Sequence, residues 1–471
     1  MPALSIAQSL HVGIAEVDIT PPDGFPMAGY YHERLATGRW DPLHAKAVVL
    51  REGETACCFV VADLTGVSRD LYEQVRRRAA EKTGIQPEHI VLSATHSHTA
   101  PDYYNHLTQF LSSDPNTRAP DAYVSNLIDA CVRAIEQADD ATIAVEALSG
   151  IANQQTPVAF NRRFVMRDGS VKTWQSFSSP QVVRSAGPID PRIGLLMFRS
   201  TNENKPLGLI SNFALHLDTV GGTKWSADFP FYIEKMVREA IGDGVVSIFG
   251  AGTCGDINHS DPSRKERNKT DRIGTLLGET VVAALPDLQP IPSPKLQVLT
   301  TTVNLPLQQV TDEQLKRAEQ LIPAAEAGEK IDFFDLVAAH KAVILHQLRE
   351  GTGEPTSEQP AARRSSLTWA GIGDSLPVDV TTITLGDQAA IVFLPGEVFV
   401  ELGLAIKQGS PYANTLVIEL SNCVETMYIP TRAAYAGGGY EVVNSAVEPG
   451  SGEMLVEAAL KLLRQSASPQ P

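Results

Sequence analysis

The stretch Ile90-Val-Leu-Ser-Ala-Thr-His-Ser-His-Thr-Ala-Pro101 joins a short apolar run to two closely spaced histidines. If a strand continues through both, residues two apart share a face, and the imidazoles of His96 and His98 point the same way. If the strand has already ended, the two rings lie together at its mouth. Imidazole nitrogen suits zinc, so either geometry favours a metal site, although two exposed loop histidines would also fit so short a motif.

The residues around this stretch predict a strand, a helix and a second strand. Residues 56–62 are apolar and β-branched, residues 69–82 have helical periodicity, and a turn at 86–88 leads into the histidine strand. This βαβ order implies a parallel pair. Four later apolar runs are also followed, just past their carboxyl end, by a polar residue. These runs are 206–214 before His216, 245–249 before Asp256, 389–394 before Glu397, and 416–420 before Tyr428.

We therefore expect an α/β fold with a mixed, largely parallel sheet flanked by helices and a metal site at the carboxyl ends of the strands. Polar residues are common after any strand because loops are polar. This general tendency explains one such residue, but it explains less well why two histidines and a glutamate all occupy such positions. We predict a single domain over residues 1–465 with a helical insertion at 311–350 and a mobile loop at 351–366. Residues 466–471 are expected to form a disordered tail.

The composition of the 471 residues excludes several kinds of partner. A net charge of −16 without a long basic run argues against nucleic acid and anionic membranes. No signal peptide and no bilayer-spanning stretch is recognisable, so we expect no stable membrane association. Five cysteines without a C-x-x-C pair indicate a reduced, cytoplasmic setting. The expected partner is a small-molecule substrate, and the sequence leaves a homo-oligomer open.

Further motifs along the chain occur in a recognisable order. They are Gly29-Tyr30, Ala94-Thr-His96-Ser-His98, Asn161-Arg162, Asn212-Phe-Ala-Leu-His216, Gly255-Asp256, Leu394-Pro-Gly-Glu397, and Tyr428-Ile-Pro-Thr431 with Tyr440-Glu441. In this order they resemble the neutral/alkaline ceramidase family, zinc amidases that cleave the amide of N-acylsphingosines. The resemblance covers the catalytic domain of that family, from about residue 12 to residue 461.

The resemblance implies a zinc ion and a role for each matching residue. His96, His216, Glu397 and Tyr428 match the zinc ligands, whereas His98, Arg162 and Tyr440 match residues around the scissile amide. Each residue also has an ordinary structural explanation. His216 would fit an apolar core, Glu397 could cap a helix beginning at Val398, the two tyrosines could be core residues, and Arg162 with Arg163 could be a solvated pair.

Three aspartates are candidates to orient a ligating imidazole, namely Asp63, Asp228 and Asp256. Each of them could instead cap a helix, which is the commoner fate of an aspartate at a strand end. Asn258 stands where the family carries a serine after its Gly-Asp pair. The serine hydroxyl is therefore lost, but a mechanism that uses zinc-activated water needs no side-chain nucleophile, and Asn258 can still donate a hydrogen bond.

These features predict a zinc-dependent amidohydrolase acting on a small or medium N-acyl compound. We expect no C-terminal β-sandwich of the kind that follows the family's catalytic domain, and the pocket loops are short, so we do not expect ceramide as substrate. Hydrolysis of an ester, lactone or glycoside is the alternative, and a non-catalytic zinc-binding protein is the third hypothesis. Two histidines, a glutamate and a tyrosine would also accept manganese or iron.

Overall fold

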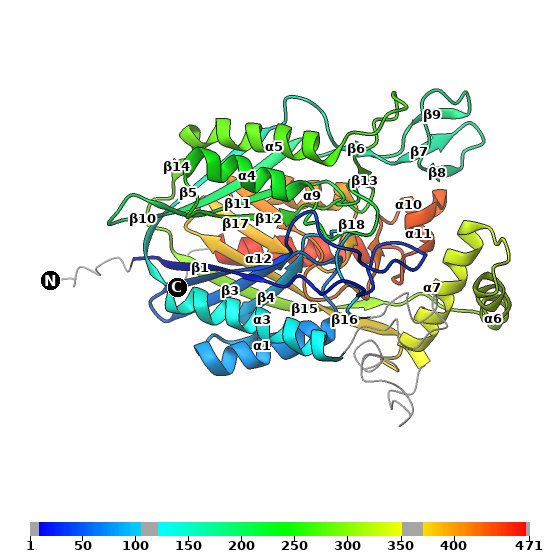
Figure 1. The fold of residues 1–471 in the computed structure, drawn as a ribbon, viewed down its shortest axis with the longest axis horizontal. Coiled ribbons are helices and arrows are strands. Elements are labelled where there is room, and N and C mark those ends of the chain that lie inside the picture. The colour runs from blue at the N-terminus through cyan, green and yellow to red at the C-terminus, as the bar shows by residue number, and fades with distance from the viewer. Residues whose placement is uncertain (1–8, 105–120, 351–370, 468–471) are drawn as a thin grey trace.

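Two β-sheets packed against each other form the centre of the computed structural model, which describes residues 9–104, 121–350 and 371–467 (Figure 1). The nine-stranded sheet contains β1 (His11–Asp18), β2 (His44–Glu52), β3 (Thr55–Ala62), β4 (Ile90–Ala94), β5 (Ile143–Asn153), β10 (Arg192–Ser200), β11 (Pro206–Phe213), β12 (Val246–Ala251) and β14 (Gln289–Pro290). The four-stranded sheet contains β15 (Leu296–Pro306), β16 (Ser375–Leu385), β17 (Ala389–Phe393) and β19 (Asn414–Ile418).

Most neighbouring strands are antiparallel, so the prediction of a largely parallel sheet is wrong. The larger sheet has the order β12-β11-β10-β5-β1-β2-β3-β4, with β14 beside β5, and only β3–β4 and β11–β12 are parallel. The smaller sheet has the order β15-β16-β17-β19, with β17–β19 parallel. Short connections, such as the two residues between β2 and β3, can join only antiparallel strands. The fold is therefore mixed α/β, and the predicted βαβ unit is one of its parallel exceptions.

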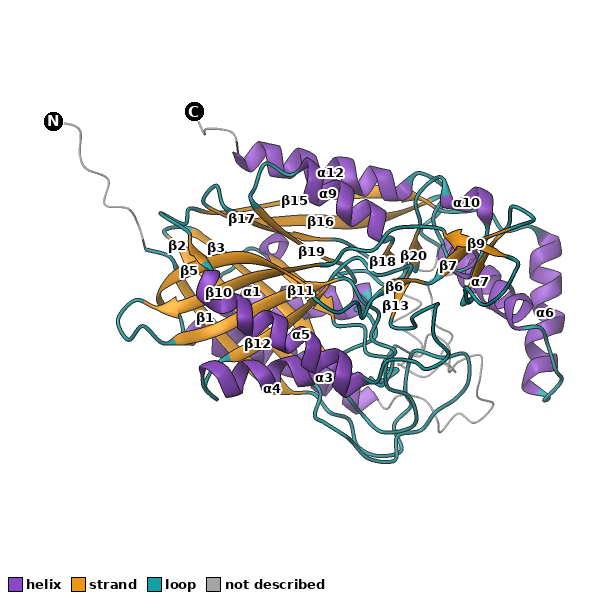
Figure 2. Cartoon of the chain, turned by 90° about the horizontal axis from the view of Figure 1, so that it is seen from above, coloured by secondary structure: helices purple, strands orange, loops and turns teal. Residues whose placement is uncertain are grey.

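Helices cover the outer faces of both sheets, as Figure 2 shows from above. On the larger sheet these are α1 (Arg69–Thr83), α3 (Asp121–Asp140), α4 (Phe229–Ile241) and α5 (Thr270–Ala284), and on the smaller sheet α9 (Val400–Gly409) and α12 (Ser451–Ala467). A buried cluster with members from both sheets fills the space between them, and includes Phe59 of β3 against Phe393 of β17 at 5.5 Å between ring centroids. Burial of these apolar faces is the main stabilising contribution to the fold.

The two helices predicted within 311–350 are α6 (Asp312–Glu326) and α7 (Phe333–Glu350). They pack on each other at one end of the sheets, where Figure 1 also shows α10 (Ala434–Gly437) and α11 (Tyr440–Val443). The second half of α7 joins the core of the smaller sheet. Whether the pair is an insertion stays a prediction. The loop predicted at 351–366 lies outside the described residues. The predicted tail begins at residue 466, but helix α12 includes residues 466 and 467. The rest of the tail lies outside the described residues.

Short strands complete the chain near the same end. They are β6 (Phe160–Asn161) with β13 (Ile257–Asn258), β7 (Arg163–Met166) with β8 (Val171–Thr173) and β9 (Val182–Ser185), and β18 (Glu397–Val398) with β20 (Tyr428–Ile429). Single-turn 3-10 helices occur at Pro87–His89 and Leu285–Asp287. None of the helices in the described parts of the chain has the length and apolar character needed to cross a bilayer.

The larger sheet curls until its two outermost strands touch. Strands β4 and β12 stand at opposite ends of the strand order, yet residues of the two are in contact. The loop after β19 bridges to β4, where the side chain of Asn422 accepts a hydrogen bond from the backbone N–H of Leu92. The carboxyl ends of β4, β11, β17 and β19 are thereby brought to one place.

Candidate metal centre and active site

Three histidine rings meet beyond the ends of β4 and β11. Strand β4 ends at Ala94, so His96 and His98 lie at its mouth rather than on one strand face. The backbone of His96 has φ of 76°, a left-handed conformation that is uncommon for this residue type and turns the ring inward. Nε2 of His96 lies 3.0 Å from Nε2 of His216 and 3.3 Å from Nε2 of His98. The three residues offer ligand atoms that all lie within 4.8 Å of one another.

Backbone carbonyls fix the orientation of two of these rings. Nδ1 of His96 lies 2.6 Å from the carbonyl oxygen of Thr65, and Nδ1 of His216 lies 3.0 Å from that of Cys254. A carbonyl only accepts hydrogen bonds, so each Nδ1 carries a proton, and each ring, when neutral, presents a lone pair on Nε2. Burial lowers the pKa of His216 well below its usual range, whereas the burial of His96 is outweighed by the carboxylate of Glu397, which raises the pKa of that ring. Nδ1 of His98 is buried and has no hydrogen-bond partner among the described residues, so its tautomer is not fixed in this way.

Glu397 and Tyr428 reach the same point from neighbouring short strands. Strand β18 pairs with β20 so that Glu397 lies opposite Tyr428. Oε2 of Glu397 lies 3.3 Å from Nε2 of His96 and 3.3 Å from Nε2 of His216. Burial would raise the pKa of Glu397, but His96, His216 and Tyr428 outweigh it and hold the pKa well below its usual range. Glu397 precedes α9 by three residues and faces the histidines instead of capping that helix.

Arg162 is a buried cation beside this group. Its Nη2 donates to the phenol oxygen of Tyr428 at 2.9 Å, and its Nε donates to Oε1 of Glu441 at 2.8 Å. Arg163 makes an ion pair with the other oxygen of Glu441 at 3.3 Å, so the two arginines are a buried pair around one carboxylate and not a solvated pair. Burial opposes the charge of Arg162, yet Tyr428, Glu441 and Glu397 keep its pKa well above the usual range.

Tyr440 begins α11 and closes one side of the site. Its ring centroid lies 5.7 Å from that of Tyr428, 4.8 Å from that of Trp174 and 6.0 Å from that of Phe333 at the start of α7. Both Trp174 and Phe333 are exposed. An aromatic wall therefore borders Tyr428, and one member of it, Tyr440, carries a hydroxyl that can serve as a hydrogen-bond donor.

None of the three aspartates considered as partners of an imidazole contacts a histidine ring at the site. Asp63 accepts from the first backbone N–H of β2 at 2.8 Å, and Asp228 accepts from the first N–H of α4 at 2.6 Å. Asp256 accepts from the first N–H of α9 at 2.9 Å and from Asn161 at 2.7 Å. Asp228 and Asp256 thus accept hydrogen bonds from backbone N–H groups at the starts of helices. This is the helix-capping role that the sequence analysis gave as the alternative to orienting an imidazole. Asn258 is buried on β13 and accepts from the N–H of Ser260 at 3.1 Å.

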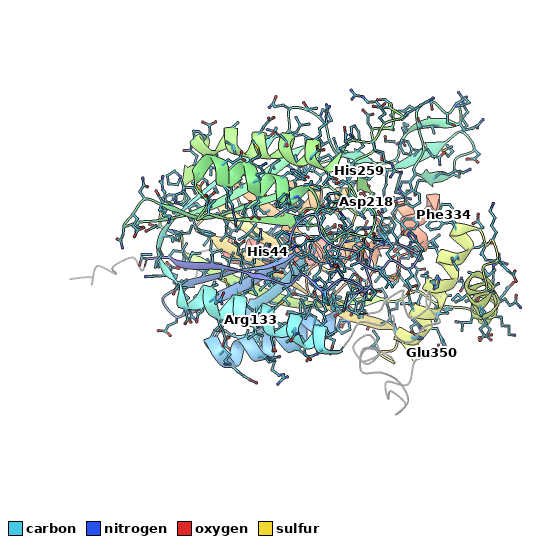
Figure 3. The ribbon with its side chains drawn as sticks, viewed as in Figure 1. His44, Arg133, Asp218, His259, Phe334 and Glu350 are labelled. Carbon is cyan, nitrogen blue, oxygen red and sulfur yellow. The ribbon has the colours of Figure 1, made fainter. Side chains whose placement is uncertain are left out.

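Asp218 and His259 form a second pair near the histidines that the sequence analysis did not assign (Figure 3). Nδ1 of His259 lies 3.2 Å from Oδ1 of Asp218, and both side chains are largely buried. Burial raises the pKa of Asp218, but His259, His216 and His98 lower it well below the usual range. The only sequence signal was the spacing of Asp218 two residues after His216, which is weak because such a pair is common.

Glu419 and Cys254 support His216, and the sequence analysis assigned neither residue to the site. Oε1 of Glu419 accepts from the Cys254 thiol at 3.0 Å, and the carbonyl of Cys254 holds Nδ1 of His216. Oε2 of Glu419 accepts from the backbone N–H of Val398, next to Glu397. Burial raises the pKa of Glu419 well above its usual range, and its two oxygens support the backbone next to two site residues.

The donor set fits a metal cation. Nε2 atoms of His96, His98 and His216 and Oε2 of Glu397 converge, and no hydrogen-bond donor among the described residues satisfies that oxygen. One proton can bridge only one pair of these acceptors, whereas a cation between them would satisfy all of them. Nitrogen and carboxylate ligands in this number suit zinc and related divalent ions. The site could thereby polarise a carbonyl group and activate water.

Comparison with known proteins gives one family and one fold. A family described as neutral/alkaline non-lysosomal ceramidase, N-terminal, matches residues 10–257. The crystal structure of neutral ceramidase from Pseudomonas aeruginosa is similar, with a TM-score of 0.70 and 18% identity over 97% of this chain and 75% of that chain. A structure described as ceramidase complexed with C2 has a TM-score of 0.69 and 18% identity over 97% of this chain and 76% of that one.

Proposed function

The chain belongs to the neutral/alkaline non-lysosomal ceramidase family, and from this premise we propose that it is a zinc-dependent amidohydrolase. Its proposed substrate is a small or medium-sized N-acyl compound rather than ceramide. The cavity bordered by Arg162 and Asn258 has a volume of about 130 Å³, below the roughly 300–1,000 Å³ of pockets that enclose a drug-sized ligand. A cavity of this size next to Arg162 supports a substrate with a compact substituent.

One observation carries the proposal. Nε2 of His96 and Nε2 of His216 face each other only 3.0 Å apart, and the carboxylate of Glu397 stands 3.3 Å from both. Lone pairs at this distance repel unless a proton or a cation lies between them. The fixed Nδ1–carbonyl bonds leave the Nε2 atoms as acceptors, which is how ligating histidines are commonly held.

We propose that His96, His216, Glu397 and Tyr428 hold the zinc ion. When bound, zinc would supply a Lewis acid that polarises an amide carbonyl and lowers the pKa of a water molecule from 15.7 to about 7. Tyr440 would donate a hydrogen bond to the carbonyl oxygen as negative charge develops there. Arg162 keeps Tyr428 oriented through its 2.9 Å bond to the phenol oxygen, and it adds a positive charge to the site.

His98 is proposed to move the proton that the departing amine requires. Burial first, and His96 second, lower the pKa of His98 to about 3, so the free ring is neutral at physiological pH. Its Nε2 faces the other histidines, while its Nδ1 is free of a fixed partner among the described residues. A neutral imidazole with one uncommitted nitrogen can accept a proton at that atom and return it.

The test is zinc content and amide hydrolysis of the purified protein beside the His96→Ala/His216→Ala double variant. Elemental analysis should give about one zinc per chain in the parent and little in the variant. The parent should hydrolyse N-octanoyl-p-nitroaniline, and the variant should be slower by about a thousandfold or more. His346→Ala, at a partly exposed side chain of α7, is the matched control and should leave both quantities unchanged.

The same assay separates amide hydrolysis from the alternative reactions. Asn258 stands where the family has a serine, and this change could suit a leaving group other than an amine. The assay should therefore also include p-nitrophenyl octanoate, a lactone and an aryl glycoside as substrates. Turnover of these compounds without amide turnover would replace the amidase proposal with another hydrolase. A protein that binds zinc but turns over none of them would be the non-catalytic protein, and a protein without zinc would remove the proposal altogether.

A further inference from the structure

A cationic cavity adjoins the histidine site. Its lining includes the buried Arg162 and Asn258, the exposed Trp174, and at the mouth the exposed Arg264, Lys265 and Arg267. The three mouth residues belong to the exposed segment between β13 and α5. The volume of about 130 Å³ suits a carboxylate or a group of similar size.

The charge balance of this cavity is opposite to that of the whole chain. Four cationic and two anionic side chains line it, although the net charge of the protein is −16. One of the anions, Asp261, is occupied, since it accepts from both the N–H and the hydroxyl of Ser263 and pairs with Arg264 at 3.3 Å. Glu266 is the other. Lys265 and Arg267 make no ion pair with any of the described residues, so the local field favours an anion.

Arg162 gives the inner end of the cavity an available hydrogen-bond donor. Nε and Nη2 of this side chain are committed to Glu441, Gly255 and Tyr428. No described residue accepts a hydrogen bond from Nη1, although the Arg162 side chain is only 3% exposed. A buried guanidinium that lines a cavity and has an uncommitted N–H group is suited to bind an acceptor oxygen there.

Trp174 connects the cavity to the reactive atoms. It lines the cavity and also lies 4.8 Å from Tyr440 between ring centroids. Its backbone has φ of 58°, which a bulky residue rarely adopts, and its N–H donates to the carbonyl of Arg162 at 2.8 Å. Burial and then Asp218 raise the pKa of Tyr30, while Arg34 and, more weakly, Arg267 oppose the rise, so the charge of Arg267 reaches a ring that lies 5.6 Å from His98. The cavity is therefore a neighbour of the site and not a remote surface feature.

We propose that this cavity binds an anionic substituent of the substrate, so that the preferred amides are N-acyl amino acids or similar anionic N-acyl compounds. The inference rests on the proposed amidohydrolase function and specifies its substrate class. Arg162 would contact the anion inside the cavity, and Lys265 and Arg267 would attract it from solution. The aromatic side of the site, formed by Trp174, Tyr440 and Phe333, would be left for the apolar acyl chain.

The test measures binding apart from turnover. The probes are the ketone analogues of N-octanoylglycine and of N-octanoylglycinamide, in which a methylene group replaces the amide nitrogen. They differ only in carrying a carboxylate or a neutral carboxamide, and neither contains the N-acyl amide bond that the enzyme is proposed to cleave. Calorimetric titration of the zinc-loaded protein should show the carboxylate binding about tenfold or more tightly, and the difference should shrink as salt screens the mouth charges.

The deciding variant is Lys265→Glu/Arg267→Glu, compared with Arg133→Glu. Both mouth residues are exposed, so the fold should tolerate their replacement. Arg133 is exposed on α3, and Figure 3 shows it on another part of the molecule. We expect the double variant to lose at least about tenfold in affinity for the carboxylate and little for the carboxamide, with no comparable loss in the control.

Failure of this inference can be told from failure of the proposed function. Equal affinity for the two analogues, or equal losses in the double variant and the control, would overturn the anionic class while leaving hydrolysis of neutral amides intact. Charge-dependent binding of the carboxylate would support the class even if the protein hydrolysed no amide of the panel. Comparing KM for N-octanoylglycine and N-octanoylglycinamide in the active protein provides the second readout, with KM expected to carry the difference.

Discussion

Nε2 of His96 lies 3.0 Å from Nε2 of His216, although 120 residues separate the two in the chain. Each ring is held by a backbone carbonyl on its other nitrogen, so the short distance is produced by the fold and not by flexible side chains. Glu397 adds a carboxylate oxygen at equal distance from both.

His98→Ala should separate zinc binding from hydrolysis. Nδ1 of His98 has no fixed partner among the described residues, unlike that of His96 or His216, so we assign it to proton movement rather than to holding zinc. We expect about one zinc per chain to remain, with kcat for amide hydrolysis reduced about 10²–10⁴-fold. Elemental analysis and steady-state kinetics measure the two effects. Loss of zinc from this variant would instead make His98 a ligand, in line with its position in the histidine cluster.

Removing metal with a chelator should destabilise the protein. A ligand that binds only the native state adds about 4 kcal/mol when its free concentration is a thousand times its Kd. We therefore expect the unfolding temperature to fall by several degrees on chelation and to recover when zinc is added back. Differential scanning calorimetry provides the measurement. The His96→Ala/His216→Ala variant is the control, and an equal response to chelation in that variant would show that the stabilising metal is bound elsewhere.

Sequence patterns predicted which strand ends meet more accurately than they predicted the topology of the sheets. The apolar runs before His96, His216 and Glu397 are strands, and the residues just past their ends do meet. The predicted pair β3–β4 is parallel, as a connection through a helix requires. Most of the remaining strands pair antiparallel because short hairpin connections force that pairing, and the prediction of a largely parallel sheet rests on the parallel units alone.

Sequence patterns could not predict which groups the site residues contact in the folded chain. The partners of the imidazoles are backbone carbonyls of Thr65 and Cys254, and every residue has a carbonyl, so no sequence pattern marks them. Asp256 was assigned to the site because it follows a strand, but its carboxylate caps α9. Glu441 follows Tyr440 in a recognised motif, yet its role around Arg162 becomes visible only when β6 and α11 are placed together.

Glu441→Gln should destabilise the site and the fold together. The carboxylate is fully buried, and it pairs with Arg162 and Arg163 and accepts from Thr173 at 3.0 Å. Removing its charge leaves two buried guanidinium groups without their anion, which costs about 3–5 kcal/mol in comparable buried pairs. Denaturant unfolding should show this loss, and kcat/KM should fall because Arg162 no longer holds Tyr428 in place.

Glu457→Gln is the matched control for this charge change. Glu457 is exposed on α12 and makes no ion pair with the described residues, so its replacement should change the free energy of unfolding by less than about 0.5 kcal/mol. Equal stability of the two variants would mean that the three buried charges do not form a coupled group. A loss of stability with unchanged kcat/KM would remove Arg162 from the positioning of Tyr428.

Asp41 should make the stability of the protein decrease as the pH rises. Burial raises the pKa of Asp41 to about 7, even though Ala227 and Ser226 donate hydrogen bonds to it. The unfolded carboxyl has a pKa of about 3.9, so between pH 5 and 7 the folded state binds the proton and the unfolded state does not. That contribution to stability is complete below about pH 3.9 and is lost progressively as the pH rises from there through about 7.

Asp41→Asn isolates this contribution because the amide resembles the protonated acid and does not titrate. The free energy of unfolding of the parent relative to the variant should fall by more than about 1.4 kcal/mol between pH 5 and pH 8, the equivalent of at least one pKa unit. Urea unfolding of both proteins across this range measures the difference. Glu448→Gln, at a partly exposed carboxyl in the segment before α12, controls for the general effect of removing a negative charge. A difference that stays constant with pH would mean that Asp41 is already ionised in the folded protein at pH 5, with its two donors compensating fully for burial.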